Sequence, residues 1–285
     1  MAYPLLESPV GSFYYYDGNK ISSDSQEAKQ LLVPTDEVTY YETLRVKCGI
    51  PLFFEDHLAR LRKSVAGIEN FEVDINGIID QSYAFIKDFD PDLDGSLRIV
   101  LTKSHLLIHV CEANIPGEKL FEEGINSLTL KWERVAPNIK VFRGDYKAAV
   151  ASKFGEKNEY GNPYEVILTD NEGRLYEGSK SNLFVILDGV VYSAPDDKIL
   201  LGITRNRVMK ALSEAGAALK YGMFTLDEIL KDKNAAMFVS STPFDILPVR
   251  YIDGHELNSC NNDLLRKIQL SYQRIADDYI VAAKR

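Results

Sequence analysis

The sequence predicts an α+β protein with two domains, and three observations support this prediction. Strand-like and helix-like segments are mixed along the chain without the regular βαβ order of a doubly wound sheet. A length of 285 residues suffices for two modest domains. The polar stretch around Pro116 and Gly117 is the best linker. We therefore expect a smaller domain at 1–116, a linker at 117–124 and a larger domain at 125–285.

The N-terminal domain is expected to combine strands with two amphipathic helices. The segment EDHLARLRKSVAGI spaces Leu58, Leu61 and Val65 at helical intervals. The next helix, DINGIIDQSYAFIKDF, has Asp74 as its expected N-cap. Strand patterns occur in SFYYYDG, VTYYETLRV, GIPLFF and SLRIVLTKSHLLIHVCE.

The C-terminal domain is expected to be rich in strands and to end in a long amphipathic helix. Its helix patterns are RNRVMKALSEAG, for which Thr204 is the expected N-cap, TLDEIL, and NDLLRKIQLSYQRIADDYIVAAK. Its strand patterns are SLTLKWERV, YEVILTD, RLYEGSKSNLFVI, VVYS and AAMFVSS.

Charge and cysteine content narrow the functional class. A net charge of −9 argues against nucleic acid or an anionic membrane as the main partner. Cys48, Cys111 and Cys260 form neither a CxxC nor a Cys/His pattern, so we expect reduced thiols in a cytoplasmic protein and no metal site. The chain shows no signal-peptide pattern and no apolar run of transmembrane length.

Three segments carry groups that could do chemistry. RLYEGSKSNLFVI puts Glu177 and polar residues where a strand would alternate, for which a β-bulge is the structural alternative. LLGITRNRV places Gly202 and a hydroxyl at a helix N-terminus, which is a ready anion site. VSSTPFD adds a second hydroxyl cluster. With a lysine and a helical arginine, these groups suit pyridoxal phosphate, which needs an amine, an acid facing its pyridine nitrogen and a phosphate cup.

Each candidate also has a structural explanation when it is taken alone. Arg60 on an amphipathic helix is typical of a solvated face, and His57 one turn earlier could cap or pack. Lys140 lies in a polar, loop-like stretch where lysines are common. Helix capping is enough to explain Thr204. Thr242 could simply follow the end of a strand.

The order YEGSKSNLFVI, ILLGITR, FVSSTPFDILPV resembles the motifs of the class IV (fold-type IV) pyridoxal-phosphate enzymes. This family includes branched-chain aminotransferases, D-amino-acid aminotransferases and aminodeoxychorismate lyases. YYETLRV, FFEDHLARLRKSV and NIKVFRGDYK are similar to its N-terminal and lysine regions. The resemblance implies the two-domain fold-type IV (D-amino-acid aminotransferase-like) architecture, pyridoxal 5'-phosphate as cofactor, and a homodimer.

The resemblance also implies roles for individual residues. Glu177 faces the pyridine nitrogen, which makes the ring an electron sink. Lys140 is the lysine that bonds to the cofactor and moves a proton during catalysis, with Lys147 as a competing candidate seven residues later. Tyr146, one residue out of register, is the candidate to bind the phenolic oxygen of the cofactor. The expected phosphate ligands are Arg60, Ile203, Thr204 and Thr242, and Leu200 packs on one face of the ring.

The motifs are less specific about the residues that bind the substrate. Tyr41 corresponds to an aromatic residue near the substrate, and Arg45 and Arg98 are compatible with branched-chain enzymes, although structural roles are equally open. D-amino-acid enzymes use an arginine in a T-R-G strand end, where this chain reads Thr-Lys-Ser-His, so Lys103 and His105 are the possible cationic substitutes.

We therefore expect a pyridoxal-phosphate-dependent aminotransferase that moves an amino group between an amino acid, with branched-chain amino acids as one candidate, and a 2-oxo acid. The alternatives are a 4-amino-4-deoxychorismate lyase that releases pyruvate and a D-amino-acid transaminase. A cofactor-binding protein with little turnover is disfavoured by the presence of Lys140 and Glu177.

Overall fold

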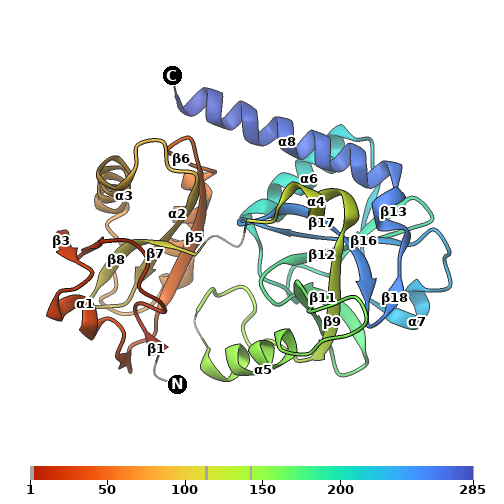
Figure 1. The fold of residues 1–285 in the computed structure, drawn as a ribbon, viewed down its shortest axis with the longest axis horizontal. Coiled ribbons are helices and arrows are strands. Elements are labelled where there is room, and N and C mark those ends of the chain that lie inside the picture. Colours follow the sequence, from red (N-terminus) through yellow and green to blue (C-terminus); the bar gives the residue numbers. More distant parts are fainter. Residues whose placement is uncertain (1–2, 113–114, 142, 285) are drawn as a thin grey trace. The chain divides into compact units, whose positions relative to one another are not determined.

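The computed structural model describes residues 3–112, 115–141 and 143–284, and its contacts divide the chain into two units (Figure 1). Unit 1 consists of Met1–Ile115, Ile139–Asp145 and Asp278–Arg285, and unit 2 of Pro116–Asn138 and Tyr146–Asp277. The short segment that carries Lys140 therefore belongs to the N-terminal unit, although it follows the first strand of the other unit in the chain.

Unit 1 is built on a six-stranded antiparallel sheet with the order β3-β2-β8-β7-β5-β6, and β1 and β4 form a separate pair. Its strands are β1 (Tyr3–Pro4), β2 (Phe13–Tyr16), β3 (Asn19–Ser22), β4 (Pro34–Thr35), β5 (Tyr40–Lys47), β6 (Ile50–Pro51), β7 (Gly95–Leu101) and β8 (Leu106–Cys111). Its helices are α1 (Gln26–Gln30), α2 (Phe54–Val65) and α3 (Ile75–Phe89).

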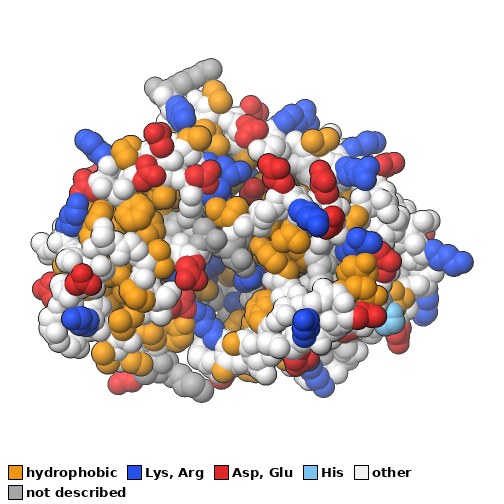
Figure 2. All heavy atoms as spheres, viewed as in Figure 1, with side chains coloured by type: hydrophobic (Ala, Val, Ile, Leu, Met, Phe, Trp, Pro, Cys, Tyr) orange, Lys and Arg blue, Asp and Glu red, His pale blue; other side chains and the backbone are white. Residues whose placement is uncertain are grey.

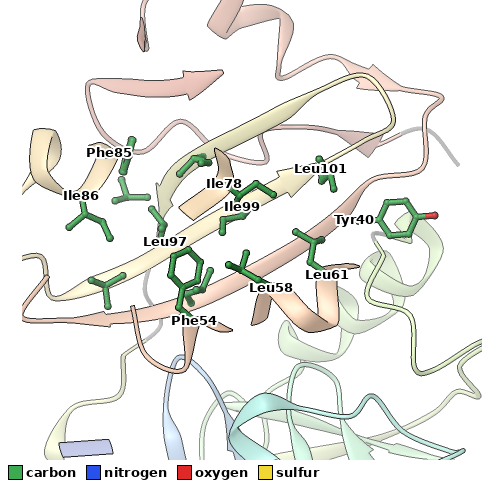
Figure 3. Close-up of a cluster of buried hydrophobic side chains, with 14 of the residues drawn as sticks. Tyr40, Phe54, Leu58, Leu61, Ile78, Phe85, Ile86, Leu97, Ile99 and Leu101 are labelled. Carbon is green, nitrogen blue, oxygen red and sulfur yellow. The ribbon is translucent and has the colours of Figure 1, made fainter. Parts of the chain in front are cut away.

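Helices α2 and α3 cover one face of this sheet. Figure 3 shows their apolar side chains packed against β7, with Leu58 and Leu61 from α2 and Phe85 from α3. Both helical patterns are thus confirmed, because their regularly spaced apolar residues are the buried ones. The N-cap prediction is also confirmed, since the Asp74 carboxylate accepts a hydrogen bond from the Gly77 N–H at 2.9 Å.

Unit 2 contains a ten-stranded mixed sheet, in which β9 runs parallel to both β10 and β17. Its strands are β9 (Ile125–Lys131), β10 (Glu165–Thr169), β11 (Arg174–Gly178), β12 (Asn182–Leu187), β13 (Val190–Ser193), β14 (Leu219–Tyr221), β15 (Phe224–Thr225), β16 (Ala236–Ser241), β17 (Asp245–Ile252) and β18 (His255–Glu256). Its helical elements are α4 (Glu118–Glu123), α5 (Gly144–Phe154), α6 (Ile203–Glu214), α7 (Leu226–Ile229), the 3-10 helix η1 (Asn258–Asn261) and α8 (Asp263–Ala283). The bounds of α5 and α8 each include a few residues of unit 1.

Two details of unit 2 differ from the sequence-based expectation. The stretch predicted as a linker contains helix α4. Thr204 is not an N-cap, because α6 begins at Ile203 and Gly202 occupies the cap position. A glycine cap has no side-chain oxygen to bind the first N–H groups, so the start of α6 has no side-chain cap hydrogen bond.

The face shown in Figure 2 carries charged side chains of both signs. On the face shown in Figure 2, acidic and basic side chains are interspersed with smaller apolar areas. Among the residues that the structure describes, no helix is long and apolar enough to cross a membrane.

The Asp74 cap leads to a simple stability prediction. Asp74→Ala should lower the free energy of unfolding by about 1 kcal/mol, because the Gly77 N–H loses its acceptor at the start of α3. Urea denaturation measures this change. The exposed Asp80 lies in the interior of the same helix, so Asp80→Ala serves as the control and should change stability by less than about 0.5 kcal/mol. An equal loss in both variants would contradict the capping role.

Candidate active site

In unit 1, a carboxylate occupies a core-facing position of β5. Side chains alternate along a strand, and Tyr40, Leu44 and Val46 belong to the core under α2 and α3. Glu42 has the same parity and is completely buried. A carboxylate at such a position must receive strong hydrogen bonds to remain ionised.

Helix α2 supplies these hydrogen bonds. Arg60 donates from Nε to Glu42 Oε1 at 2.7 Å and from Nη2 to Oε2 at 2.5 Å, while His57 Nδ1 lies 2.7 Å from Oε2. His57 and Arg60 can share one carboxylate because residues three apart lie on the same helix face. The Arg60 side chain is only 10% exposed, so it is not the solvated surface residue that amphipathic spacing alone would suggest.

The charges of this cluster affect one another. Burial raises the pKa of Glu42. The Arg60 guanidinium and the His57 hydrogen bond lower it by more than burial raises it, so the pKa lies well below its usual range. Burial lowers the pKa of His57 despite the contact with Glu42, and the positive charges of Arg60 and Lys140 lower it more. We infer a neutral His57 that donates from Nδ1, and its buried Nε2 has no hydrogen-bond partner in the described part of the chain.

Unit 1 also contains the candidate lysine. Val141 forms an isolated antiparallel bridge with Tyr40 at the start of β5. Lys140 Nζ lies 4.9 Å from the centroid of the Tyr41 ring, and its charge acts on His57 together with that of Arg60. Three residues that were predicted for different roles, Lys140, Arg60 and Tyr41, are therefore brought together within this unit.

The predicted substrate residues of unit 1 have other partners here. The buried Arg45 donates to the carbonyls of Val46 and Gly95 at 2.7 and 2.9 Å and pairs with Asp94. Arg98 pairs with Glu7, donates to Thr43 at 3.3 Å and lies 5.6 Å from the Tyr41 ring centroid. Lys103 is exposed in the turn after β7, and His105 Nδ1 lies 2.8 Å from Asp17 Oδ2. Arg98 therefore lies beside Tyr41.

In unit 2, an irregularity in the sheet precedes Glu177. Leu168 pairs with Glu177 and the next residue of β10, Thr169, pairs with Leu175, so Tyr176 is an extra residue in β11. Such a bulge redirects the following side chain. Glu177 is 1% exposed; its Oε1 accepts from Arg134 Nη1 and its Oε2 from the Leu200 N–H, each at 3.1 Å.

The ionisation of Glu177 reflects opposing influences. Burial raises its pKa, the Arg134 charge and the Leu200 hydrogen bond lower it, and the nearby Glu165 raises it again, with the net effect upward. Arg134 is therefore the cation that favours the ionised form of Glu177 in this unit.

The segment before α6 is bound to the same strands. Asn182, which pairs with Glu177 across β11 and β12, donates from Nδ2 to the Leu200 carbonyl at 2.8 Å. A Cβ atom on Gly202 would lie only 2.2 Å from Asn182 Oδ1, so a larger residue would displace the Asn182 amide that binds Leu200. At the start of α6, Thr204 Oγ1 lies 3.5 Å from Thr242 Oγ1 of the β16–β17 turn. Ile203 is the first residue of the helix.

This donor set fits the cofactor that the motifs predict. The N-terminus of α6 has no side-chain cap hydrogen bond within the described residues, and two hydroxyls lie 3.5 Å apart beside it, so it is suited to a phosphate. The buried Glu177 carboxylate is suited to a protonated pyridine nitrogen. Ser240 adds a buried hydroxyl without a partner within residues 3–112, 115–141 and 143–284.

Two residues of α5 complete the candidates. Tyr146 donates from its hydroxyl to the Ser179 carbonyl at 2.6 Å, and burial raises its pKa. The hydroxyl proton of Tyr146 is thus donated to a backbone carbonyl. Burial lowers the pKa of the competing Lys147 to about 8.

The sequence analysis missed Glu42, Arg134, Glu165 and Asn182 as members of these clusters. Two of these four residues could have been detected from the sequence. Glu42 shares one face of its strand with Tyr40, Leu44 and Val46, and Glu165 directly precedes the apolar run 166–168. A charged residue at such a position predicts a buried partner but not which one.

A comparison with protein families matches residues 39–252 to the family model described as amino-transferase class IV. Among curated proteins, the branched-chain-amino-acid aminotransferase of Pseudomonas aeruginosa is 30% identical over 186 residues, which are 62% of this chain and 60% of that protein. The D-alanine aminotransferase of Bacillus licheniformis is 28% identical over 254 residues, covering 82% of this chain and 86% of that protein. The chain thus spans less than two thirds of the Pseudomonas enzyme.

Solved structures show the same fold. The branched-chain amino acid aminotransferase of Escherichia coli matches with a TM-score of 0.74 at 20% identity, covering 94% of this chain and 95% of that one. A putative 4-amino-4-deoxychorismate lyase of Legionella pneumophila matches with a TM-score of 0.70 at 18% identity, covering 84% and 91%. These likenesses confirm the predicted α+β, fold-type IV architecture.

The Glu42 cluster leads to a second stability prediction. Glu42→Gln should lower the free energy of unfolding by about 3 kcal/mol, because it removes the buried negative charge that compensates the Arg60 guanidinium. Urea denaturation at neutral pH measures this loss, and Glu69→Gln, at an exposed site in the same unit, is the control.

The pH dependence of that difference is a further check. The folded-state pKa of Glu42 is depressed, so its contribution is complete above the unfolded value of about 4.3 and is lost as the pH falls towards the folded value. Wild type and variant should therefore converge in stability in acid. A gap that widened below pH 4 would contradict an ionised Glu42.

Proposed function

The chain belongs to the class IV aminotransferase family, and on that basis we propose that it moves an amino group between an amino acid and a 2-oxo acid with pyridoxal phosphate as cofactor. The prediction made from the three motifs is confirmed at the level of the family. Class IV aminotransferases depend on this cofactor, and one structural neighbour from Mycobacterium tuberculosis is a PLP-bound form.

The observation that carries the proposal is the pair of bonds around Leu200. Glu177 accepts from the Leu200 N–H, and three residues later α6 begins with an anion-binding N-terminus. One continuous segment of backbone therefore connects an acid suited to the pyridine nitrogen with donors suited to the phosphate. This is the combination that pyridoxal phosphate requires.

Each residue would contribute a separate function. Bound pyridoxal phosphate supplies an aldehyde that reacts with amines and a ring that accepts electron density from the substrate's α-carbon. Lys140 would bond to the aldehyde and then move a proton at that carbon. Glu177 would accept a hydrogen bond from the pyridine nitrogen, and Tyr146 would lie near the phenolic oxygen. The phosphate would be bound by Arg60, Ile203, Thr204 and Thr242, and Leu200 would pack on the ring.

For the substrate carboxylate we propose Arg98 first, because it lies beside Tyr41. Arg45 and Lys103 remain candidates from the motif comparison. Branched-chain amino acids are the first donors to test, since several of the curated relatives carry that name. We further propose a cytoplasmic location, which the free thiols of the three cysteines support. We also propose a homodimer, which the family resemblance supports.

The identity of the lysine can be tested directly. Borohydride reduces the bond between cofactor and lysine to a stable label, and peptide mapping should find that label on Lys140. The support is the match of Lys140 to the lysine region of the family, together with its position 4.9 Å from the ring centroid of Tyr41. Lys140→Arg should abolish labelling, whereas the matched Lys147→Arg should keep it. A label on Lys147 would show that the register is wrong.

The reaction can be tested by giving the loaded enzyme an amino donor without any oxo acid. A transaminase leaves the amino group on the cofactor. The absorbance of the bound cofactor should therefore change stoichiometrically to that of pyridoxamine phosphate. Adding 2-oxoglutarate or pyruvate should then restore the original spectrum. Branched-chain L-amino acids, L-glutamate and D-alanine form the donor panel. If no donor acts while aminodeoxychorismate yields pyruvate catalytically, the lyase alternative is correct.

A further inference from the structure

A second buried carboxylate, Glu165, lies behind the loop that follows Glu177. It opens strand β10 and has no solvent exposure. Its Oε1 accepts from the Val166 N–H at 2.8 Å, from the Ser179 hydroxyl at 2.6 Å and from the Ser179 N–H at 3.2 Å. Its Oε2 accepts from the Ser181 hydroxyl at 2.7 Å. A carboxyl group that only accepts hydrogen bonds matches the ionised form.

These contacts explain the two serines of the EGSKSN stretch. Ser179 and Ser181 are two residues apart and both reach inward to Glu165, whereas Lys180 between them is exposed. The backbone approaches as closely as the hydroxyls do. A Cβ atom on Gly178 would lie 2.0 Å from Ser181 Oγ and 3.0 Å from Glu165 Cδ, so a side chain there would displace the Ser181 hydroxyl from its contact with Glu165.

The loop determines how the flanking residues meet Leu200. Glu177 and Asn182 stand at its two ends and pair with each other. Glu177 binds the Leu200 N–H and Asn182 binds the Leu200 carbonyl. The conformation of the four loop residues therefore determines where the Glu177 carboxylate lies relative to the start of α6.

We propose that Glu165 is a positioning residue: its buried charge and its hydrogen bonds to Ser179 and Ser181 fix the loop that directs Glu177 toward the cofactor. This inference rests on the proposed function, because Glu177 needs direction only if it meets a pyridine nitrogen. Glu165 itself does not touch the reacting atoms. It acts through the two serines and, across a short distance, through its charge.

The charge has a separate consequence. Arg134 from the segment after β9 and Glu165 from β10 shift the pKa of Glu177, and the charge of Glu177 raises the pKa of Tyr146 in α5 and of Tyr176 in β11. Of these, Arg134 favours ionisation of Glu177 and Glu165 opposes it. Replacing Glu165 by a neutral isostere therefore lowers the pKa of Glu177, which then stays ionised to lower pH.

The test compares Glu165→Gln, Glu165→Ala and Ser181→Ala with Glu172→Gln, an exposed carboxylate in the turn between β10 and β11. Equilibrium titration of the cofactor-free proteins with pyridoxal phosphate gives the dissociation constant, and thermal melting shows whether each variant is folded. We expect Glu165→Ala to raise the constant about tenfold or more. Glu165→Gln keeps an oxygen for the donors on Oε1, so it should recover most of the affinity at neutral pH.

The pH dependence of cofactor binding distinguishes positioning by a charge from simple packing. In Glu165→Gln, the acid-side loss of affinity should move to lower pH, while Glu172→Gln should follow wild type. Ser181→Ala removes one hydrogen bond and no charge, so it should weaken binding without moving the acid limb. A glutamine variant with an unmoved acid limb, or folded Glu165→Ala with wild-type affinity, would overturn the inference.

These outcomes are independent of the proposed reaction. If the wild-type protein binds pyridoxal phosphate but no donor converts it, the aminotransferase proposal fails while the affinity comparison still tests Glu165. If the wild type transaminates and the Glu165 variants resemble Glu172→Gln, only the positioning role fails.

Discussion

The structure depends on one electrostatic constraint: a carboxylate buried in a sheet must be surrounded by donors that replace water. Glu42, Glu165 and Glu177 are all at most 1% exposed, and each lies on a strand of a core sheet. An unpaired charge in such a place costs several kcal/mol, so the surrounding segments must supply donors. The donors come from helix α2, from the loop after β11 and from the segment before α6. Satisfying these carboxylates therefore holds α2, the loop after β11 and the segment before α6, which carry several of the candidate site residues.

In each unit, the hydrogen bonds and ion pairs of a buried carboxylate also fix the position or charge of a candidate site residue. In unit 1, Glu42 takes two of the five N–H groups of the Arg60 guanidinium, which fixes its rotamer before any ligand arrives. Less side-chain entropy is then lost on binding. In unit 2, Arg134 compensates Glu177 while Glu165 opposes it. Burial still raises the pKa of Glu177 overall, so a cation such as a protonated pyridine nitrogen beside it would favour its ionised form.

Local patterns predicted the elements well, and they predicted tertiary partners poorly. The Asp74 cap and the helices around Leu58 and Phe85 followed from spacing within one or two turns. Thr204 was assigned wrongly as a cap because a hydroxyl near a helix start is a common cap, whereas Gly202 takes that place under the Asn182 side chain. The two serine donors of Glu165 lie 14 and 16 residues away, in the turn after the neighbouring strand, where periodicity carries no information.

The unusual composition of the EGSKSN stretch thus has two physical origins rather than one. Glu177 is redirected by the bulge at Tyr176 and is tied to Leu200. The small residues that follow it serve a different carboxylate, because Ser179 and Ser181 bind Glu165 and Gly178 leaves room for it. A motif read only as a set of ligand contacts would assign both serines to the cofactor. Glu177 lies near the end of β11, whereas Ser179 and Ser181 lie in the turn that follows, so the turn and not the alternation of a strand decides which carboxylate each side chain meets.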